Sequence, residues 1–235
     1  MRGGTIVTAA GSFRGDVLVR HGRTESVWRP EHELNDRPPA LREIDASGLL
    51  VLPGIVDVHT HTRVPSDARP DRFFDDSVGA AFGGTTTFLT FNNPGTGISE
   101  AAQRTLRAGI AEFRAATAGE SAVDFGLSGV ITAQQEKPEA DIAAAIDEGV
   151  ATFKVFLVYD FGVDTDRLRE LLYVTHTAGG LLQVHGEDRA MLDAGIAEQL
   201  AAGRTQPRYH ADSRPPVVEA TGTPVAIDIA REVGA

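Results

Sequence analysis

The chain of 235 residues contains no cysteine, and this absence excludes three kinds of chemistry. A disulfide framework, a cysteine-based zinc site and a thiol nucleophile are all ruled out. The sequence also lacks an apolar run long enough to cross a bilayer and the hydrophobic region of a signal peptide. We therefore expect a cytoplasmic protein.

Clusters of basic residues are missing as well. Asp and Glu number 33 against 22 Lys and Arg, which gives a formal net charge of −11 at pH 7. This balance argues against nucleic acid and membranes as partners, because both are recognised through basic surfaces. Apolar residues make up 42% of the chain and charged residues 23%, a composition that predicts an ordinary globular protein.

The hydrophobic pattern changes near residue 52. Short strand-like runs at 5–8, 16–19 and 49–52 predict a small β module over residues 1–52. Over residues 53–235, strand patterns alternate with Ala-rich helical patterns, which predicts a parallel sheet. The expected strands are 54–61, 85–92, 124–131, 152–158 and 181–185, and the expected helices are 75–82, 100–116, 137–147, 166–178, 189–202 and 217–233. Five such α/β units favour an incomplete (β/α) TIM-type barrel, since a closed barrel has eight.

Two histidines follow the first of these strands. Ile55, Val56 and Val58 form a β-branched apolar run, which predicts a buried parallel strand that ends at His59 and His61. Residues i and i+2 of a strand share a face, with Cα atoms about 6.6 Å apart. Two imidazoles so placed can converge on one metal ion at about 2.0–2.1 Å. The alternative is a pair of histidines in an exposed turn.

Two further candidates lie on later strands. Lys154 interrupts an apolar strand, and burial would lower its pKa and populate the neutral, nucleophilic amine. Such an amine can react with carbon dioxide to give a carbamate that bridges two metals. His185 ends the strand 181–185. The alternatives are a lysine that reaches solvent and an ordinary core histidine, but three strand ends that carry such residues together favour a site.

Five motifs occur in an order and spacing that resemble the cyclic amidohydrolases, and among them dihydropyrimidinase and hydantoinase. They are Pro-Gly-Ile-Val-Asp-Val-His-Thr-His at 53–61, Phe-Gly-Gly-Thr-Thr-Thr at 82–87, Thr-Phe-Lys-Val-Phe-Leu-Val-Tyr at 152–159, Val-His-Gly-Glu-Asp at 184–188 and Tyr-His-Ala-Asp-Ser-Arg-Pro-Pro at 209–216. The resemblance implies a metal-dependent barrel beside a small β-sandwich, of which residues 1–52 would form part. It also implies a hydrolase that opens cyclic amides or ureides, usually as an oligomer.

The same resemblance implies roles for individual residues. His59 and His61 would bind one divalent ion, preferably zinc, and His185 would bind a second. Carbamylated Lys154 would bridge the two ions. Tyr159 would contact the substrate and steady the tetrahedral oxyanion.

The family pattern is incomplete in this sequence. A histidine ligand on the sixth barrel strand and an aspartate on the eighth, which serves as ligand and general base, have no counterpart. The sequence therefore resembles the N-terminal half of such an enzyme. We expect it to need a C-terminal half-chain or to form a homo-oligomer, and activity of the isolated chain is not expected.

Two alternatives to a dihydropyrimidinase or hydantoinase remain. Arg63 and Asn93 resemble the residues with which dihydroorotases hold a substrate carboxylate, so a dihydroorotase-like or allantoinase-like hydrolase is one of them. A solvated arginine and a turn asparagine would explain both residues as well. The other alternative is a non-catalytic, truncated homologue that acts as a binding or assembly module, because an open sheet edge invites pairing.

Overall fold

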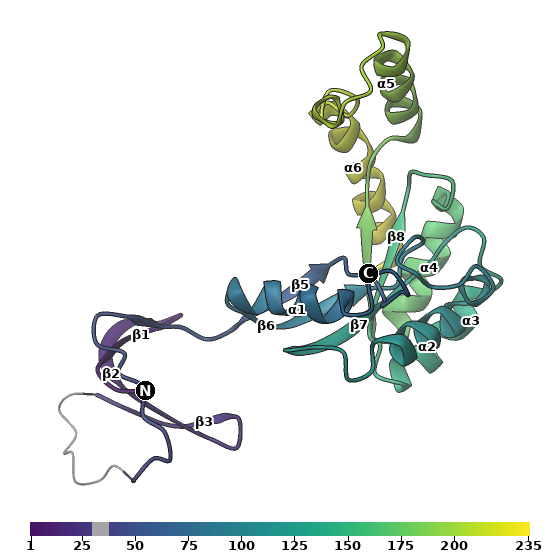
Figure 1. Ribbon diagram of the computed structural model, residues 1–235. Helices are drawn as coiled ribbons and strands as arrows, with labels where there is room; N and C mark the ends of the chain where they lie inside the picture. The colour runs from purple at the N-terminus through teal and green to yellow at the C-terminus, as the bar shows by residue number, and fades with distance from the viewer. Residues whose placement is uncertain (30–37) are drawn as a thin grey trace. The chain divides into compact units, whose positions relative to one another are not determined.

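The computed structural model describes residues 1–29 and 38–235. The chain divides into two compact units, Met1–Ile55 and Val56–Ala235. Each unit has its own sheet (Figure 1).

The first unit contains one four-stranded sheet in the order β3-β2-β1-β4. Its strands are β1 (Gly4–Thr8), β2 (Gly11–Arg20), β3 (Arg23–Trp28) and β4 (Leu50–Val51). The β2–β3 hairpin turns at His21 and Gly22, whose φ angles of 51° and 74° suit a two-residue turn. The described residues of this unit form a single sheet, so the β-sandwich stays a prediction.

The second unit is built on five parallel strands in chain order. They are β5 (Ile55–Thr60), β6 (Thr85–Phe91), β7 (Asp124–Val130), β8 (Thr152–Phe156) and β9 (Leu181–His185). Each begins within one residue of its expected position, β5 to β8 end one or two residues earlier than expected, and β9 has the expected bounds. The α/β alternation predicted for this part of the chain is confirmed.

Helices cover one face of this sheet. They are α1 (Arg72–Phe82), α2 (Leu106–Thr117), α3 (Pro138–Asp147) and α4 (Thr165–Thr177). Two more helices follow along the chain, α5 (Arg189–Ala201) and α6 (Pro216–Val233), of which α6 packs against α4. The core lies between helices and strands and includes Phe73, Phe88, Leu106, Ile142, Phe153 and Leu168. No helix in the described ranges is long and apolar enough to cross a membrane.

The five-stranded sheet is strongly curled. His59 on β5 and Gln183 on β9 are bonded through Nδ1 and Oε1 at 2.9 Å, although these are the two edge strands. In a flat sheet the edge strands would lie about 19 Å apart, at about 4.8 Å per strand. The sheet therefore curves as part of a barrel wall, which confirms the incomplete barrel at this level.

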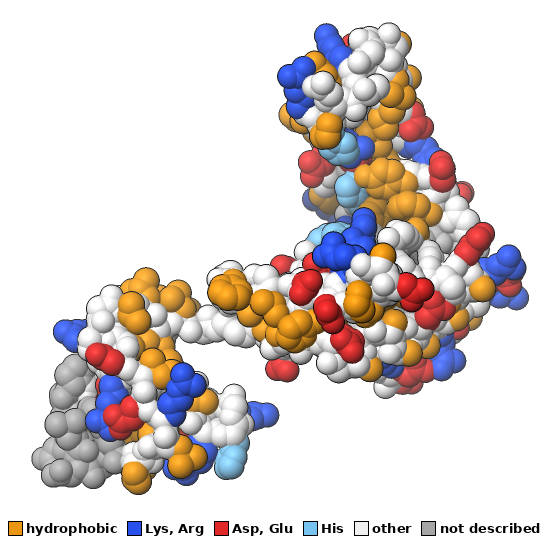
Figure 2. Space-filling model, viewed as in Figure 1, with side chains coloured by type: hydrophobic (Ala, Val, Ile, Leu, Met, Phe, Trp, Pro, Cys, Tyr) orange, Lys and Arg blue, Asp and Glu red, His pale blue; other side chains and the backbone are white. Residues whose placement is uncertain are grey.

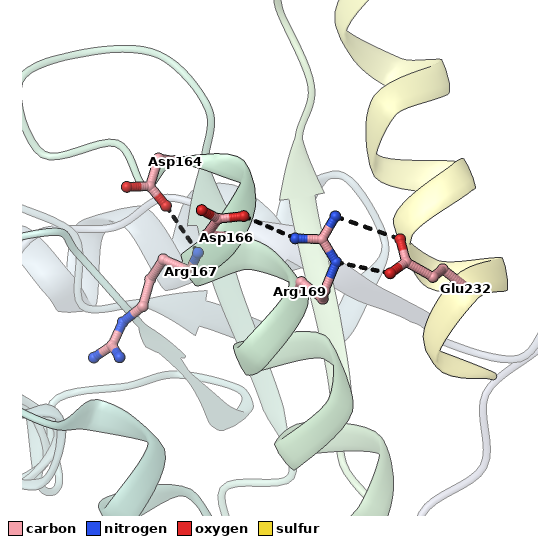
Figure 3. Close-up of polar contacts among 5 residues, drawn as sticks. All are labelled: Asp164, Asp166, Arg167, Arg169 and Glu232. Atoms are coloured by element: carbon pink, nitrogen blue, oxygen red, sulfur yellow. Dashed lines mark hydrogen bonds and ion pairs between the residues drawn. The ribbon is translucent and has the colours of Figure 1, made fainter.

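Helix α6 is anchored on α4 (Figure 3). Arg169 of α4 contacts Glu232 of α6 through Nε at 3.0 Å and Nη2 at 3.4 Å, and its Nη1 also contacts Asp166 at 2.9 Å. Asp164 caps the start of α4 by accepting a hydrogen bond from the backbone N–H of Arg167. Surface ion pairs contribute little stability, so α6 is held mainly by its apolar residues, among them Ile229 in the core.

The expectation that β5 is buried is wrong for its apolar side chains. Ile55, Val56 and Val58 are 53%, 61% and 57% exposed. The pattern is that of a strand buried on both faces, but β5 is an edge strand with a neighbour on one side only. Figure 2 shows hydrophobic side chains at the surface over the end of this unit formed by α1 and β5. Burial depends on what covers a strand, and the local sequence does not contain that information.

Candidate active site

Strand alternation places the predicted metal ligands on the concave side of the curled sheet, here called the inner face. On β8, Lys154 points to the inner face, whereas Phe153 and Val155 on either side of it lie in the helix-covered core. His59 and His185 occupy matching inward positions near the C-terminal ends of β5 and β9. In α/β barrels this end of the strands carries the chemistry.

His59 and His61 lie side by side over Phe91. Their ring centroids are 5.4 Å apart. The ring centroid of Phe91 lies 4.7 Å from that of His59 and 4.9 Å from that of His61. Nδ1 of His59 meets Gln183 Oε1 at 2.9 Å, and Nδ1 of His61 meets Asn93 Oδ1 at 3.2 Å. Because both partners are acceptor oxygens, each Nδ1 donates and each Nε2 keeps a lone pair.

The electrostatic surroundings favour neutral imidazole at His61. Its pKa is lowered, first by burial and then by His59, while the hydrogen bond to Asn93 acts in the opposite direction. Lys154 and His185 lower the pKa further. A neutral ring is the form that binds metal ions.

Lys154 is buried and has no polar partner. The residue is 4% exposed, so most of its side chain lies out of contact with solvent. Its Nζ lies 5.3 Å from the ring centroid of Phe156 and 5.9 Å from that of Phe91, and no hydrogen bond or ion pair to it exists within residues 1–29 and 38–235. Burial lowers the pKa of this amine, so the neutral, nucleophilic form is populated more than in water.

His185 and Tyr159 complete this part of the inner face. The ring of His185 lies 5.5 Å from that of Phe156 and 5.9 Å from that of Tyr159, and its Nε2 contacts Glu187 Oε2 at 2.6 Å. Tyr159 has a φ of 69°, an uncommon backbone conformation for a residue with a bulky side chain. Arg189 donates a hydrogen bond to its carbonyl oxygen. Such strained positions cluster at functional sites.

The remaining predicted residues behave differently from one another. Asn93 lies at the site, but its side chain contacts His61. Arg63 is exposed, and its side chain makes no hydrogen bond or ion pair with any part of the chain that the structure describes. The sequence analysis missed Gln183 and gave Glu187 no role. Both could have been found, because they lie two residues before and after His185.

The donor set fits divalent metal ions. Each of the three histidines uses one ring nitrogen to contact an oxygen acceptor and keeps the other free, as metal-binding histidines usually do. The buried amine of Lys154 lies on the same face. Among the described residues, no three His, Cys, Asp or Glu side chains are grouped closely enough to hold an ion in the present arrangement.

Comparison with known proteins places this geometry in a family. No protein-family model matches the chain. The whole chain is 32% identical over 239 residues to a D-hydantoinase of Streptomyces coelicolor and 34% identical over 238 residues to a D-phenylhydantoinase of Escherichia coli, of which it covers 50% and 49%. It also matches a solved structure of a D-hydantoinase with a TM-score of 0.84 and 33% identity, again over all of this chain and 50% of the other. The chain thus spans about half the length of these relatives, and its homologues are hydantoinases.

Proposed function

We propose that this chain supplies the metal-binding half of a hydrolase that opens cyclic amides or ureides, with a dihydropyrimidine or hydantoin ring as substrate. The observation that carries the proposal is the set of four donor side chains on one inner face, His59, His61, Lys154 and His185. The names of the relatives, D-hydantoinase and D-phenylhydantoinase, support the substrate class.

The proposed roles follow from the free donor atoms. His59 and His61 would hold one divalent ion, with zinc suited to imidazole ligands, and His185 would hold a second. The neutral Nζ of Lys154 would add to carbon dioxide, so that an N–C bond forms and a proton leaves, and the oxygens of the resulting carbamate would serve as further metal ligands. Such ions, when bound, lower the pKa of a bound water and polarise a ring carbonyl.

Tyr159 is the proposed substrate-contacting residue. Its phenol would donate a hydrogen bond to the carbonyl oxygen as negative charge develops there. Support comes from its ring, which lies 5.9 Å from that of His185, and from its positive φ of 69°. Rigid placement matters because a donor stabilises the developing charge only where it is already aligned.

A dihydroorotase-like or allantoinase-like substrate is the alternative within the same chemistry. Arg63 is exposed and without a described partner, which leaves its guanidinium free to hold a carboxylate in two hydrogen bonds. Asn93 is already bonded to His61 at 3.2 Å, which supports a role in orienting that histidine instead. Only one of the two residues therefore favours a carboxylate-bearing ring.

Turnover by a reconstituted protein tests the proposal. The chain would be mixed with zinc, bicarbonate and a separately expressed chain that carries the barrel half present in the relatives. We expect hydrolysis of hydantoin or dihydrouracil, its loss in His59→Ala and Lys154→Ala, and its retention in Lys137→Ala, which replaces an exposed lysine. Hydrolysis of dihydroorotate alone would favour the alternative substrate. Absence of any turnover, with Lys154→Ala indistinguishable from the unmodified chain, would overturn the proposal.

A second candidate function, a non-catalytic assembly module, rests on the exposed apolar side chains of the edge strands. Val56 and Val58 share one face of β5, and Leu181 on β9 is 61% exposed. Unpaired strand edges with apolar side chains associate with other chains. We expect the isolated chain to self-associate in sedimentation velocity and the double variant Val56→Lys, Val58→Lys to shift it toward monomer. A monomeric unmodified chain would contradict this reading.

A further inference from the structure

A buried carboxylate connects His185 to the motif at 209–216. Glu187 is 8% exposed, and its Oε2 contacts Nε2 of His185 at 2.6 Å. Its other oxygen, Oε1, faces Nε of Arg214 at 3.7 Å. This Nε is buried and has no hydrogen-bond partner in the part of the chain that the structure describes. The guanidinium is placed on its other side by a contact of 2.9 Å between Nη1 and His210 Nε2.

Helix α6 fixes the backbone that carries Glu187. The N–H of Asp188 donates to the carbonyl of Val218 at 2.9 Å, and the hydroxyl of Thr223 donates to the carbonyl of Gly186 at 3.1 Å. The two segments touch so closely at Gly222 that a Cβ there would lie 2.4 Å from the carbonyl carbon of Glu187. Glu187 therefore has little freedom to move relative to α6.

Helix α5 fixes the segment that carries Arg214. A Cβ on Gly195 of α5 would lie 2.2 Å from the carbonyl oxygen of Ser213, so the two backbones are in direct contact. Ser213 is buried, and its hydroxyl donates to the carbonyl of His210 at 2.8 Å. Two separate helices, α6 and α5, thus hold Glu187 and Arg214 in place beside His185.

We propose that Glu187 and Arg214 are positioning residues for His185. In this arrangement Nε2–H of His185 donates to Glu187, so Nδ1 carries the lone pair and becomes the metal-binding nitrogen. Arg214 orients Glu187 and balances its negative charge. The inference rests on the proposed function for the metal role of His185. It assigns a purpose to the motifs at 184–188 and 209–216. Carboxylate partners of this kind fix the tautomer and orientation of metal-binding histidines and raise their basicity.

The first part of the test uses the unmodified, metal-free chain. Long-range ¹H–¹⁵N correlation spectra of the imidazoles at about pH 8.5, roughly two units above the ordinary imidazole pKa, report which nitrogen carries the proton. We expect His185 to be protonated at Nε2, with a proton protected from exchange with water. Protonation at Nδ1 would overturn the proposal, whether or not the chain binds zinc, so this outcome is independent of the proposed function.

The second part measures zinc affinity by competition with a chelating dye. We expect Glu187→Gln to weaken binding about 10- to 100-fold and to expose the Nε2 proton to exchange, and Arg214→Met to weaken binding less. The double variant should lose less than the two losses combined, because both residues act through one histidine. Glu170→Gln, which alters an exposed Glu–Arg pair on α4, is the matched control and should change neither readout. Unchanged affinity and unchanged exchange in Glu187→Gln would overturn the proposal.

Discussion

Lys154→Met is expected to stabilise the metal-free chain while it abolishes capture of carbon dioxide. The amine is buried between Phe91 and Phe156 and lacks a hydrogen-bond partner among the described residues. Burying a polar group without such a partner costs on the order of 1–3 kcal/mol. Methionine has a similar length and no charge, so the unfolding free energy at pH 7 should rise by about that amount.

The same variant should change how stability depends on pH. Burial lowers the pKa of Lys154 below its unfolded value of about 10.4, so between the two pKa values the unfolded chain binds more protons than the folded one. The contribution of Lys154 to the unfolding free energy therefore rises with pH between these two pKa values. Its destabilising effect is complete below the folded-state pKa and absent above the unfolded-state pKa. Lys154→Met should remove this rise.

The control is built into the sequence, because Lys137 is the only other lysine. It is exposed and precedes α3, so Lys137→Met should leave both the stability and its pH dependence nearly unchanged. Urea unfolding at several pH values, followed by far-UV circular dichroism, measures both variants. A loss of stability in Lys154→Met at pH 7 would show that the amine has a stabilising partner, contrary to this account.

Gly222→Ala is expected to be among the most damaging single-methyl changes. Its Cβ would lie 2.4 Å from the carbonyl carbon of Glu187 and 2.7 Å from both the Gly186 oxygen and the Asp188 nitrogen, all of them backbone atoms. Neither segment can move aside without breaking the contacts that hold α6. Overpacking of this kind costs about 1–3 kcal/mol, and zinc binding through His185 should weaken at the same time.

Gly79→Ala in α1 is the matched comparison. Both glycines lie inside helices, but a Cβ at Gly79 meets no atom within 4 Å. Alanine there should stabilise the chain by about 0.5–1 kcal/mol, the ordinary gain in helix propensity. If Gly222→Ala gave a similar gain in urea unfolding, the close packing of α6 on the segment after β9 would be disproved.

Local patterns were sufficient to predict most of the second unit. β-branched apolar runs followed by Ala-rich stretches located the five strands and six helices, because alternation and helical periodicity are properties of neighbouring residues. The pairing of His59 with His61 and their position at a strand end follow from the same period of two. In the first unit, β3 was missed, because Arg23–Trp28 is rich in polar residues.

Contacts between distant segments could not be derived in this way. The bond from His59 to Gln183 joins residues 124 positions apart and exists only because the sheet curls. The two contacts that join His185 to Glu187 and Glu187 to Arg214 depend on where α5 and α6 pack, which no local pattern specifies. The exposure of β5 is of the same kind, since it depends on the neighbours of the strand.

The central claim, that the inner face binds metal through a modified Lys154, is tested most directly by a native mass spectrum. The chain would be purified with zinc and ¹³C-labelled bicarbonate, beside Lys154→Met and Lys137→Met. The account predicts bound zinc together with a carbon dioxide adduct that persists in Lys137→Met and disappears in Lys154→Met. A metal-free, unmodified chain, or an adduct that follows Lys137, would contradict it.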